Sequence, residues 1–225
     1  MAPAAPAASP ATLVVTEIFR SLQGESSFAG RPCTFVRLTG CALRCVWCDS
    51  AYAFTGGTER SVDDVVAEVA RLGLDLVEIT GGEPLEQPAF GELAARLCDA
   101  GRTVLVETGG HVSVADVDPR VIKILDVKCP GSGMESRNDL DNLNRLAPRD
   151  EVKFVVADRR DFEWAERMVS DRRLDETHKV LISPVFEGNA SPIAPEVAEW
   201  VRDSERKLVL NLQLHKVLWG DVPGR

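Results

Sequence analysis

Short runs of apolar, β-branched residues alternate with amphipathic stretches along most of this 225-residue chain. The runs predict strands at residues 13–19, 34–38, 75–80, 103–107, 121–126, 152–156, 180–183 and 208–212. The stretch from Ser61 to Gly73 predicts a helix, because its valines fall on one face and Ser61 is a good N-cap. Further helices are expected at 88–98, 139–146, 162–169 and 195–201. Alternating βα units predict a parallel sheet, wound either as an open sheet or as a barrel.

Polar and glycine-rich clusters follow several of the predicted strands. They include TGGEP at 80–84, ETGG at 107–110, DVKCPGSG at 126–133 and QLHK at 213–216. Barrel active sites gather at the carboxyl ends of the strands, so these loops are expected to converge on one mouth. Helices are fewer than strands. We therefore predict an α/β fold built as an incomplete, partial TIM-type barrel.

Length and charge narrow the possible functions. The 26 Lys and Arg residues against 35 Asp and Glu give a net charge of −9, which argues against direct binding of nucleic acid. Residues 1–11 are rich in Ala and Pro and predict a disordered leader, which leaves 12–225 as a single domain. No apolar run approaches the roughly 18 residues of a membrane span. Six cysteines without an export signal predict the cytoplasm, where clustered cysteines are more often metal ligands than disulfides.

A cysteine loop at 40–50, GCALRCVWCDS, has the spacing C-x₃-C-x₂-C and contains Cys41, Cys45 and Cys48. Zinc sites usually need four ligands, and no further cysteine suits the loop. Cys33 is expected at the opposite end of strand 34–38, Cys98 lies in a predicted helix, and nothing pairs Cys129 with the loop. A [4Fe–4S] cluster on three cysteines would leave one iron open to an exogenous ligand. A structural zinc module and an electron-transfer iron–sulfur protein, which should have a fourth cysteine, remain as alternatives.

The cysteine spacing, with Trp47 directly before the last cysteine, resembles that of the radical S-adenosylmethionine (SAM) superfamily. The TGGEP segment, one βα unit downstream, matches the GGE motif of that superfamily. The resemblance implies that the open iron binds the amino and carboxylate groups of SAM, and that cleavage of SAM gives a 5′-deoxyadenosyl radical that abstracts hydrogen. Gly81 and Gly82 would let the backbone approach SAM, with Glu83 shaping the turn.

A second resemblance begins with EIFRSLQGESSFAGRPCTFVRLTGC at 17–41 and continues through CDS, ITGGEP, ETGG, KCPGSG, VKFVV, ISPVF and QLHK. These segments resemble the 7-carboxy-7-deazaguanine synthase family over roughly residues 15 to 218. The resemblance implies a reduced β6/α3 core and a radical SAM-dependent ring contraction of 6-carboxy-5,6,7,8-tetrahydropterin. It also implies that ammonia is lost, that Mg²⁺ assists, and that the product enters queuosine or 7-deazapurine biosynthesis. A homodimer and a flavodoxin or ferredoxin reductant are expected.

The site residues of the family are carried over where this sequence matches its motifs. The implied substrate contacts are Leu22, Gln23, Gly24, Glu25, Arg37, Thr80 and His215. The implied SAM contacts are Trp47, Cys48, Asp49, Gly82, Glu107, Asp126, Val127 and Lys128. Ser50 stands where the family has a threonine whose hydroxyl binds Mg²⁺. Asp126 and Val127 depart from a segment often written S-P-K, so only backbone contacts are expected from this pair.

Several assignments have a competing structural interpretation. Arg37 could form a surface salt bridge, Asp49 could stabilise a turn, and His215 could be purely structural. Arg37 lies in an apolar strand leading into the cysteine loop, which favours a bidentate clamp for a carboxylate. A small glycyl-radical activase would share the cysteine motif but act on a protein. The LQGE–AGRP–arginine arrangement argues against that alternative.

Overall fold

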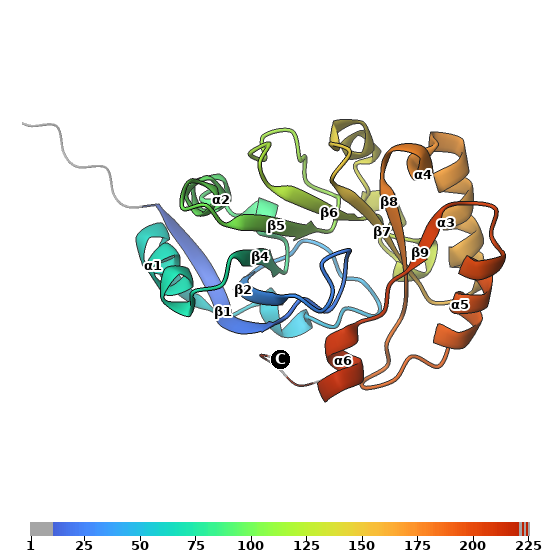
Figure 1. The fold of residues 1–225 in the computed structure, drawn as a ribbon, viewed down its shortest axis with the longest axis horizontal. Coiled ribbons are helices and arrows are strands. Elements are labelled where there is room, and N and C mark those ends of the chain that lie inside the picture. The colour runs from blue at the N-terminus through green and yellow to red at the C-terminus, as the bar shows by residue number, and fades with distance from the viewer. Residues whose placement is uncertain (1–10, 221, 223, 225) are drawn as a thin grey trace, which may run out of the picture.

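The computed structural model describes residues 11–220, 222 and 224 and has a single curved sheet (Figure 1). The nine strands lie in the order β3-β1-β2-β4-β5-β6-β7-β8-β9. Their bounds are β1 (Thr12–Leu22), β2 (Pro32–Leu38), β3 (Thr58–Ser61), β4 (Leu76–Gly81), β5 (Thr103–Thr108), β6 (Ile122–Asp126), β7 (Glu151–Val156), β8 (Lys179–Pro184) and β9 (Leu208–Leu210). Within the described residues the edge strands β3 and β9 do not pair with each other, so the expected incomplete barrel is confirmed.

Neighbouring strands are parallel along the part of the sheet that runs β2-β4-β5-β6-β7-β8-β9. In contrast, β1 is antiparallel to both of its neighbours, β2 and β3. The expected parallel sheet is confirmed for most strands and is wrong for β1 and β3. Residues 23–31 connect β1 to β2 without a helix. A parallel pair needs a crossover of about a dozen residues or more. A connection this short can therefore join only antiparallel neighbours.

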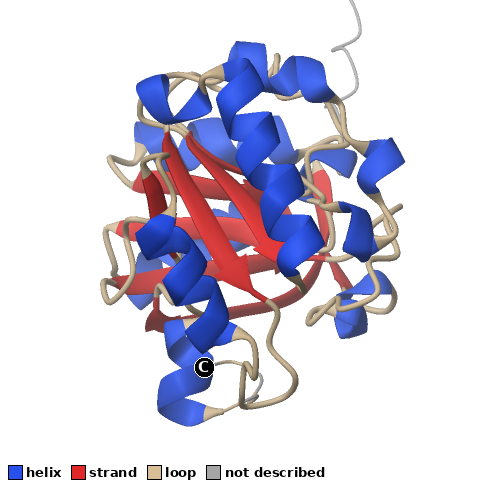
Figure 2. Cartoon of the chain, turned by 90° about the vertical axis from the view of Figure 1, so that its right-hand side faces the viewer, coloured by secondary structure: helices blue, strands red, loops and turns tan. Residues whose placement is uncertain are grey.

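Helices cover the outer face of the sheet (Figure 2). The longer ones are α1 (Val62–Leu72), α2 (Phe90–Asp99), α3 (Arg159–Arg172) and α5 (Ala194–Asp203), and the short ones are α4 (Leu174–Thr177) and α6 (Leu214–Trp219). The caps predicted for α1 are confirmed, because Ser61 accepts a hydrogen bond from the Asp64 N–H at 3.1 Å and Gly73 has φ 73°. Strands β2 and β4–β8 with α1, α2 and α3 form the reduced core, which α5 and β9 extend.

Several segments differ from the sequence-based expectation, and β3 and α4 were not predicted at all. Residues 139–146, expected as an α-helix, contain the 3₁₀ helix Leu140–Arg145, whose start is capped by the Asp139 side chain. The helix α6 was not expected, because its apolar residues Val217 and Leu218 face outward and give no core-facing stripe. The expected leader, residues 1–11, lies outside the described residues except for Ala11.

The sheet is buried on both faces, and β4 shows how the two sides differ. Val77 and Ile79 pack in the large core beneath the helices, whereas Leu76 packs inside the barrel. The interior cluster comprises Cys33, Phe35, Leu76, Leu105 and Ile124, with Phe19, Phe28 and Ile122 packed against it. This apolar cluster closes the end of the barrel where the parallel strands begin. Polar side chains occupy the interior above it.

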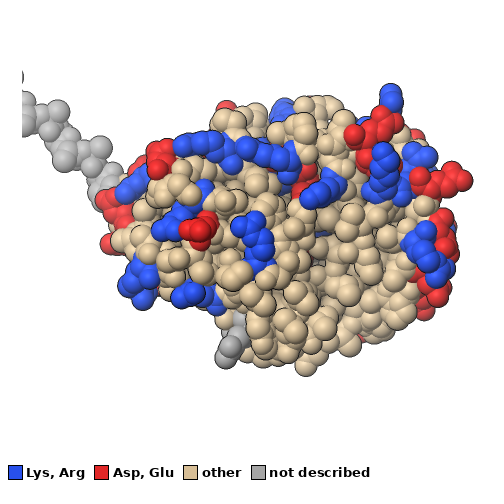
Figure 3. Space-filling view, viewed as in Figure 1, with Lys and Arg blue, Asp and Glu red and all other residues tan. Residues whose placement is uncertain are grey.

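The outer surface carries mixed charges. On the face shown in Figure 3, Lys and Arg side chains lie mostly along the upper and lateral margins with Asp and Glu near them, and the lower centre around α6 is largely uncharged. In the described part of the chain, no helix is long and apolar enough to cross a membrane.

Candidate active site

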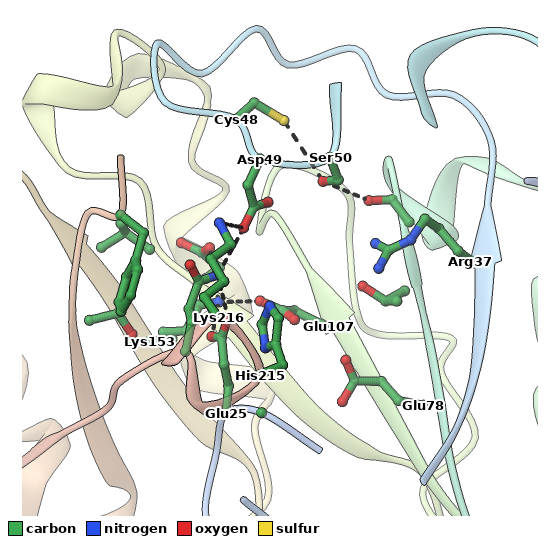
Figure 4. Close-up of a pocket in the computed structure, with 18 of the residues that line it drawn as sticks. Glu25, Arg37, Cys48, Asp49, Ser50, Glu78, Glu107, Lys153, His215 and Lys216 are labelled. Atoms are coloured by element: carbon green, nitrogen blue, oxygen red, sulfur yellow. Dashed lines mark hydrogen bonds and ion pairs between the residues drawn. The ribbon is translucent and has the colours of Figure 1, made fainter. Parts of the chain in front are cut away.

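A cavity of about 240 Å³ opens at the carboxyl ends of the parallel strands (Figure 4). Segments far apart in the sequence form its wall: the loop after β1, the cysteine loop, the ends of β4–β8 and helix α6. The predicted site residues that line it are Leu22, Gln23, Gly24, Glu25, Arg37, Cys45, Trp47, Cys48, Asp49, Ser50, Thr80, Glu107, Asp126, Lys128 and His215. Cys41, Gly82 and Val127 are not among its lining residues.

The three cysteines of the loop are free thiols. Cys41 Sγ accepts a hydrogen bond from the Leu43 N–H at 3.3 Å, and burial raises the pKa of Cys41 to about 11. Across the residues described, no three His, Cys, Asp or Glu side chains converge as a site for one metal ion. A [4Fe–4S] cluster does not need such convergence, because each thiolate binds a different iron. The donor set therefore fits a cluster better than a mononuclear zinc site.

The other cysteines lie away from this loop. Cys33 sits at the start of β2 with 0% exposure, in the apolar cluster at the closed end of the barrel. Its predicted place at the opposite end of the strand is confirmed, and burial raises its pKa far above the ordinary value of a thiol. Cys129 is 1% exposed and packs in the helix-covered core. Cys98 belongs to α2, as expected.

The TGGEP turn packs directly against the cysteine loop. The Gly82 N–H donates to Leu38 O at 3.1 Å, and the Glu83 N–H donates to Gly40 O at 2.7 Å. A Cβ on Gly82 would lie 1.9 Å from Gly40 O, so only glycine permits this approach. The second glycine of the motif thus serves contact between two backbone segments of the protein, a role that the sequence did not indicate.

Glu83 ties the same turn to the loop after β5. Its carboxylate, 0% exposed, accepts from the Leu85 N–H at 3.0 Å, the Thr108 hydroxyl at 2.8 Å and the Gly109 N–H at 2.8 Å. The predicted role of Glu83 in shaping the turn is confirmed. The cysteine loop, TGGEP and ETGG are in this way held as one rigid rim of the cavity.

Arg37 extends from β2 toward the cavity (Figure 4). Its Nε donates to Glu17 Oε1 at 2.7 Å, and its guanidinium lies 5.6 Å from the centre of the Tyr52 ring. The Tyr52 hydroxyl donates to the same Glu17 oxygen at 2.7 Å. Among the described residues the Arg37 Nη groups have no partner. Arg37 therefore does form a salt bridge, as the competing structural interpretation expected. Its two Nη groups are still available to bind a ligand.

Asp49 links the cysteine loop to α6. Its Oδ2 accepts from Gln213 Nε2 at 2.8 Å and from Lys216 Nζ at 3.1 Å. Burial raises the pKa of Asp49, but Lys216 and Gln213 outweigh it and lower the pKa to about 2. Gln213 also donates to Glu25 Oε1 at 2.8 Å, so it joins the cysteine loop to the loop after β1. Gln213 and Lys216 were missed as site residues, although the QLHK segment that contains them was noticed.

His215 packs on the glycine of the LQGE segment. A Cβ on Gly24 would lie 2.1 Å from His215 Nδ1, so Gly24 makes room for the ring. Burial lowers the pKa of His215, which favours the neutral imidazole at neutral pH. The Leu214 N–H donates to Gly24 O at 2.8 Å and keeps α6 against this loop.

A buried charge cluster surrounds Lys153, a residue that the sequence analysis did not select. Lys153 Nζ contacts Glu107, lies 2.9 Å from Glu25 Oε2 and lies 3.6 Å from Asp126 Oδ2. Burial lowers the pKa of Lys153, but Glu107, Glu25 and Asp126 raise it well above the ordinary value, so the ammonium stays charged. The only signal in the sequence was a lysine facing inward from the apolar strand VKFVV.

The predicted SAM segment after β6 divides between the core and the cavity. Val127 is 2% exposed and packs in the helix-covered core, so its side chain does not reach the cavity. Asp126 pairs with Lys128 at 2.9 Å inside the cavity. The backbone contacts predicted for Asp126 and Val127 stay predictions. Glu107 likewise pairs with Lys153 through Oε1, and its Oε2 has no partner among the described residues.

Ser50 directly follows Asp49 at the edge of the cavity. Its hydroxyl lies 3.8 Å from Cys48 Sγ and donates only a long hydrogen bond, 3.5 Å, to Gly81 O. Such a weakly held hydroxyl can turn toward a ligand at little cost. The Mg²⁺ contact expected for Ser50 stays a prediction.

Comparison with known proteins agrees with the resemblance. A model of the radical SAM superfamily matches residues 35–157. The 7-carboxy-7-deazaguanine synthase of Koribacter versatilis (strain Ellin345) is 45% identical over 217 residues, covering 91% of this chain and 96% of the relative. The corresponding protein of Chlorobaculum tepidum is 41% identical over 212 residues, covering 93% and 95% of the two chains.

Among solved structures, the crystal structure of QueE from Escherichia coli superposes with a TM-score of 0.74 at 25% identity, covering 91% of this chain and 95% of that one. The superfamily implies a [4Fe–4S] cluster and SAM. Agreement extends from the sequence to the fold and covers at least 95% of each of these relatives. The chain belongs to the 7-carboxy-7-deazaguanine synthase family of the radical SAM superfamily.

Proposed function

We propose that this chain converts 6-carboxy-5,6,7,8-tetrahydropterin into 7-carboxy-7-deazaguanine and ammonia, in queuosine or 7-deazapurine biosynthesis. One observation carries the proposal: a single cavity joins the cysteine loop to Arg37 and to the LQGE loop after β1. A pterin carboxylate needs a cation for its carboxylate and hydrogen-bonding groups for its flat ring. Product and ammonia together account for every atom of the substrate, so the reaction requires no net oxidant.

The cluster would be held by Cys41, Cys45 and Cys48, and SAM would lie along the rim formed by the cysteine loop, TGGEP and the ends of β5 and β6. The residues proposed for SAM are Trp47, Cys48, Asp49, Gly82, Glu107, Asp126, Val127 and Lys128. When bound, the cluster and SAM together supply the one-electron chemistry that removes a hydrogen atom from the substrate. The protein positions the substrate and excludes water from the cavity.

Arg37 would bind the substrate carboxylate through its two Nη groups, which is the bidentate geometry that arginine favours. Its Nε already donates to Glu17, and one face of the guanidinium already lies over the Tyr52 ring. The guanidinium is therefore preorganised. Burial raises the pKa of Glu25, but Lys153 and Gln213 lower it below the ordinary value. Glu25 is therefore ionised and suited to accept hydrogen bonds from ring N–H groups.

Leu22, Gln23, Gly24, Thr80 and His215 would complete the substrate site, as family resemblance implies. Mg²⁺ would take one oxygen from Ser50 and the rest from water and substrate, since it keeps several such ligands. Serine retains the hydroxyl of the threonine found in the family but loses the methyl group that restricts its rotamers. Loss of the methyl group changes the affinity for Mg²⁺, but the ligand atom is still a hydroxyl oxygen.

Three further parts of the proposal concern partners and location. A flavodoxin or ferredoxin would deliver the electron, and the cytoplasm would be the compartment. A homodimer is supported by exposed apolar side chains on α6, where Val217 is 60% and Leu218 52% exposed. Analytical ultracentrifugation of wild-type protein against Leu218→Lys tests the dimer.

The proposal is tested anaerobically. The reconstituted protein is mixed with SAM, Mg²⁺, reductant and 6-carboxytetrahydropterin, and the deazapurine and ammonia are quantified. Equal amounts of the two products support the proposal. Cleavage of SAM without either product would restrict the conclusion to membership of the superfamily and reject this substrate.

A further inference from the structure

A buried carboxyl group on the cavity floor has no role in the site as described so far. Glu78 lies in the middle of β4, every residue of which is buried, and is itself 2% exposed. Val77 and Ile79 on either side of it pack under the helices, so Glu78 faces the barrel interior. It lines the cavity just above the apolar cluster that contains Leu76. A carboxyl group buried at such a place costs stability unless other groups satisfy it.

Protein groups satisfy only one side of this carboxyl. Gln23 Nε2 donates to Glu78 Oε2, and Gln23 Oε1 accepts from the Glu25 N–H at 3.0 Å, which fixes the orientation of the Gln23 amide. Within the described residues, the Glu78 side chain has no other hydrogen bond and no ion pair. Figure 4 shows its carboxyl facing the cavity, apart from the network around Lys153. The oxygen Oε1 is therefore left for a ligand.

The surroundings favour the protonated form of Glu78. Burial, followed by the nearby carboxylates of Glu107 and Glu25, raises its pKa well above the ordinary value. Lys153 also lies near, but it is engaged by three other carboxylates. A neutral carboxyl group has one O–H donor. Because Oε2 accepts from Gln23, the proton belongs on Oε1, and the group presents a donor to the cavity.

We infer that Glu78 binds the substrate by donating a hydrogen bond from its hydroxyl to a carbonyl oxygen or an unprotonated ring nitrogen of the heterocycle. The inference rests on the proposed function, because a pterin has such acceptors on its edge. Glu25 and Glu78 then divide the work: the ionised carboxylate accepts from ring N–H groups, and the neutral acid donates to a ring acceptor. Two carboxyl groups with opposite hydrogen-bonding roles can distinguish the donor and acceptor pattern of one heterocycle from another.

Two substitutions distinguish the effect of the hydrogen-bond donor at position 78 from the effect of filling the space with a side chain. Glu78→Gln can accept from Gln23 through its carbonyl and present its NH₂ to the cavity, so it keeps the donor at every pH. Glu78→Leu fills the space without a donor. Glu151→Gln is the matched control, because Glu151 is also buried in the barrel at 1% exposure but accepts from the Ser27 N–H at 3.1 Å and does not line the cavity.

The measurement is anaerobic calorimetry of 6-carboxytetrahydropterin binding to iron-loaded protein with SAM, between about pH 6 and about pH 9. Iron content and melting temperature show that each variant is folded. Near neutral pH, Glu78→Gln and Glu151→Gln are expected to bind as wild type does, and Glu78→Leu to bind about 3- to 10-fold more weakly, which is the effect of one neutral hydrogen bond. Above the raised pKa of Glu78, wild type loses the donor and binds more weakly, whereas Glu78→Gln does not.

Other groups around Glu78 titrate as well, so the wild-type affinity is divided by that of Glu78→Gln at each pH. The groups that act on Glu78, present in both proteins, are Glu25 after β1, Cys33 on β2, Glu107 on β5 and Lys153 on β7. Asp126 on β6 acts on Lys153 and lines the same cavity. A ratio that falls with rising pH supports the inference, and a flat ratio overturns it.

Two results at neutral pH also overturn the inference. Wild-type affinity in Glu78→Leu would place Glu78 outside the substrate site. Equal weakening of binding in Glu78→Gln and Glu78→Leu would mean that the carboxylate form binds. If iron-loaded wild type cleaves SAM but does not bind the pterin at all, the proposed function fails and this inference fails with it.

Discussion

The contact between the TGGEP turn and the cysteine loop can be tested by one added methyl group. In Gly82→Ala, the new Cβ would lie 1.9 Å from Gly40 O and 2.5 Å from Gly40 C. Real Cβ atoms essentially never come within 3.0 Å of another heavy atom, so Gly40 O must retreat by at least 1.1 Å. Gly40 directly precedes Cys41, so the shift is passed to the first cysteine of the loop.

The structure also sets the size of the effect. Overpacking typically costs about 1–3 kcal/mol. The shift also strains the hydrogen bonds from the Gly82 N–H to Leu38 O and from the Glu83 N–H to Gly40 O, each of which contributes about 0.5–1.5 kcal/mol. We therefore expect Gly82→Ala to destabilise the apoprotein by about 2–6 kcal/mol. Its iron content after anaerobic reconstitution should fall well below that of wild type.

Gly91→Ala is the matched control. Gly91 lies in α2, and no atom lies within 4 Å of its added Cβ. Alanine favours a helix over glycine by up to about 1 kcal/mol, so this variant should melt slightly above wild type and bind a full complement of iron. Thermal melts followed by circular dichroism and iron assays compare the three proteins. Full iron content and an unchanged melting temperature in Gly82→Ala would refute the reasoning.

The remaining predictions use the same iron assay, turnover and thermal melts. Cys33→Ala should retain iron, whereas Cys45→Ala should lose it, because Cys33 lies at the closed end of the barrel; loss of iron in both would contradict the three-cysteine site. Asp49→Asn should lower the melting temperature at neutral pH. The pKa of Asp49 is lowered from 3.8 to about 2, so its carboxylate stabilises the fold fully above pH 3.8. This stabilisation is lost as the pH falls through about 2, where the two proteins should melt alike. Ser50→Ala should raise the Mg²⁺ concentration for half-maximal turnover about tenfold, equivalent to about 1.4 kcal/mol, and Ser50→Thr should not; equal Mg²⁺ dependence in all three would exclude Ser50 as a ligand.

Much of the site was predictable because its motifs are local. Most strands of the sheet are short β-branched runs, and the loops that follow the strands contain the cysteines, TGGEP and ETGG. Parallel strands bring such loops to one end of the sheet whatever their separation in sequence. That rule is why residues as far apart as Cys48 and His215 were expected together and line one cavity.

The contacts inside that cavity were not predictable in the same way. Lys153 meets Glu25 across 128 residues, and Gln213 meets Asp49 across 164 residues. No periodicity in the sequence encodes such pairs, because they depend on how each strand is rotated and how far α6 reaches over the mouth. Val127 illustrates the converse: its neighbours Asp126 and Lys128 line the cavity, but its own side chain points into the core.

The sequence by itself determined the chemistry that is available: a three-cysteine loop, a glycine-rich TGGEP turn, and a set of strands whose apolar faces need burial in a parallel sheet. The tertiary structure decided the state of each group. Burial and neighbouring charges lower the pKa of Glu25 and raise that of Glu78, although both are glutamates of the same cavity. A pKa depends on desolvation and on charges within a few ångströms, and these are properties of the folded chain alone.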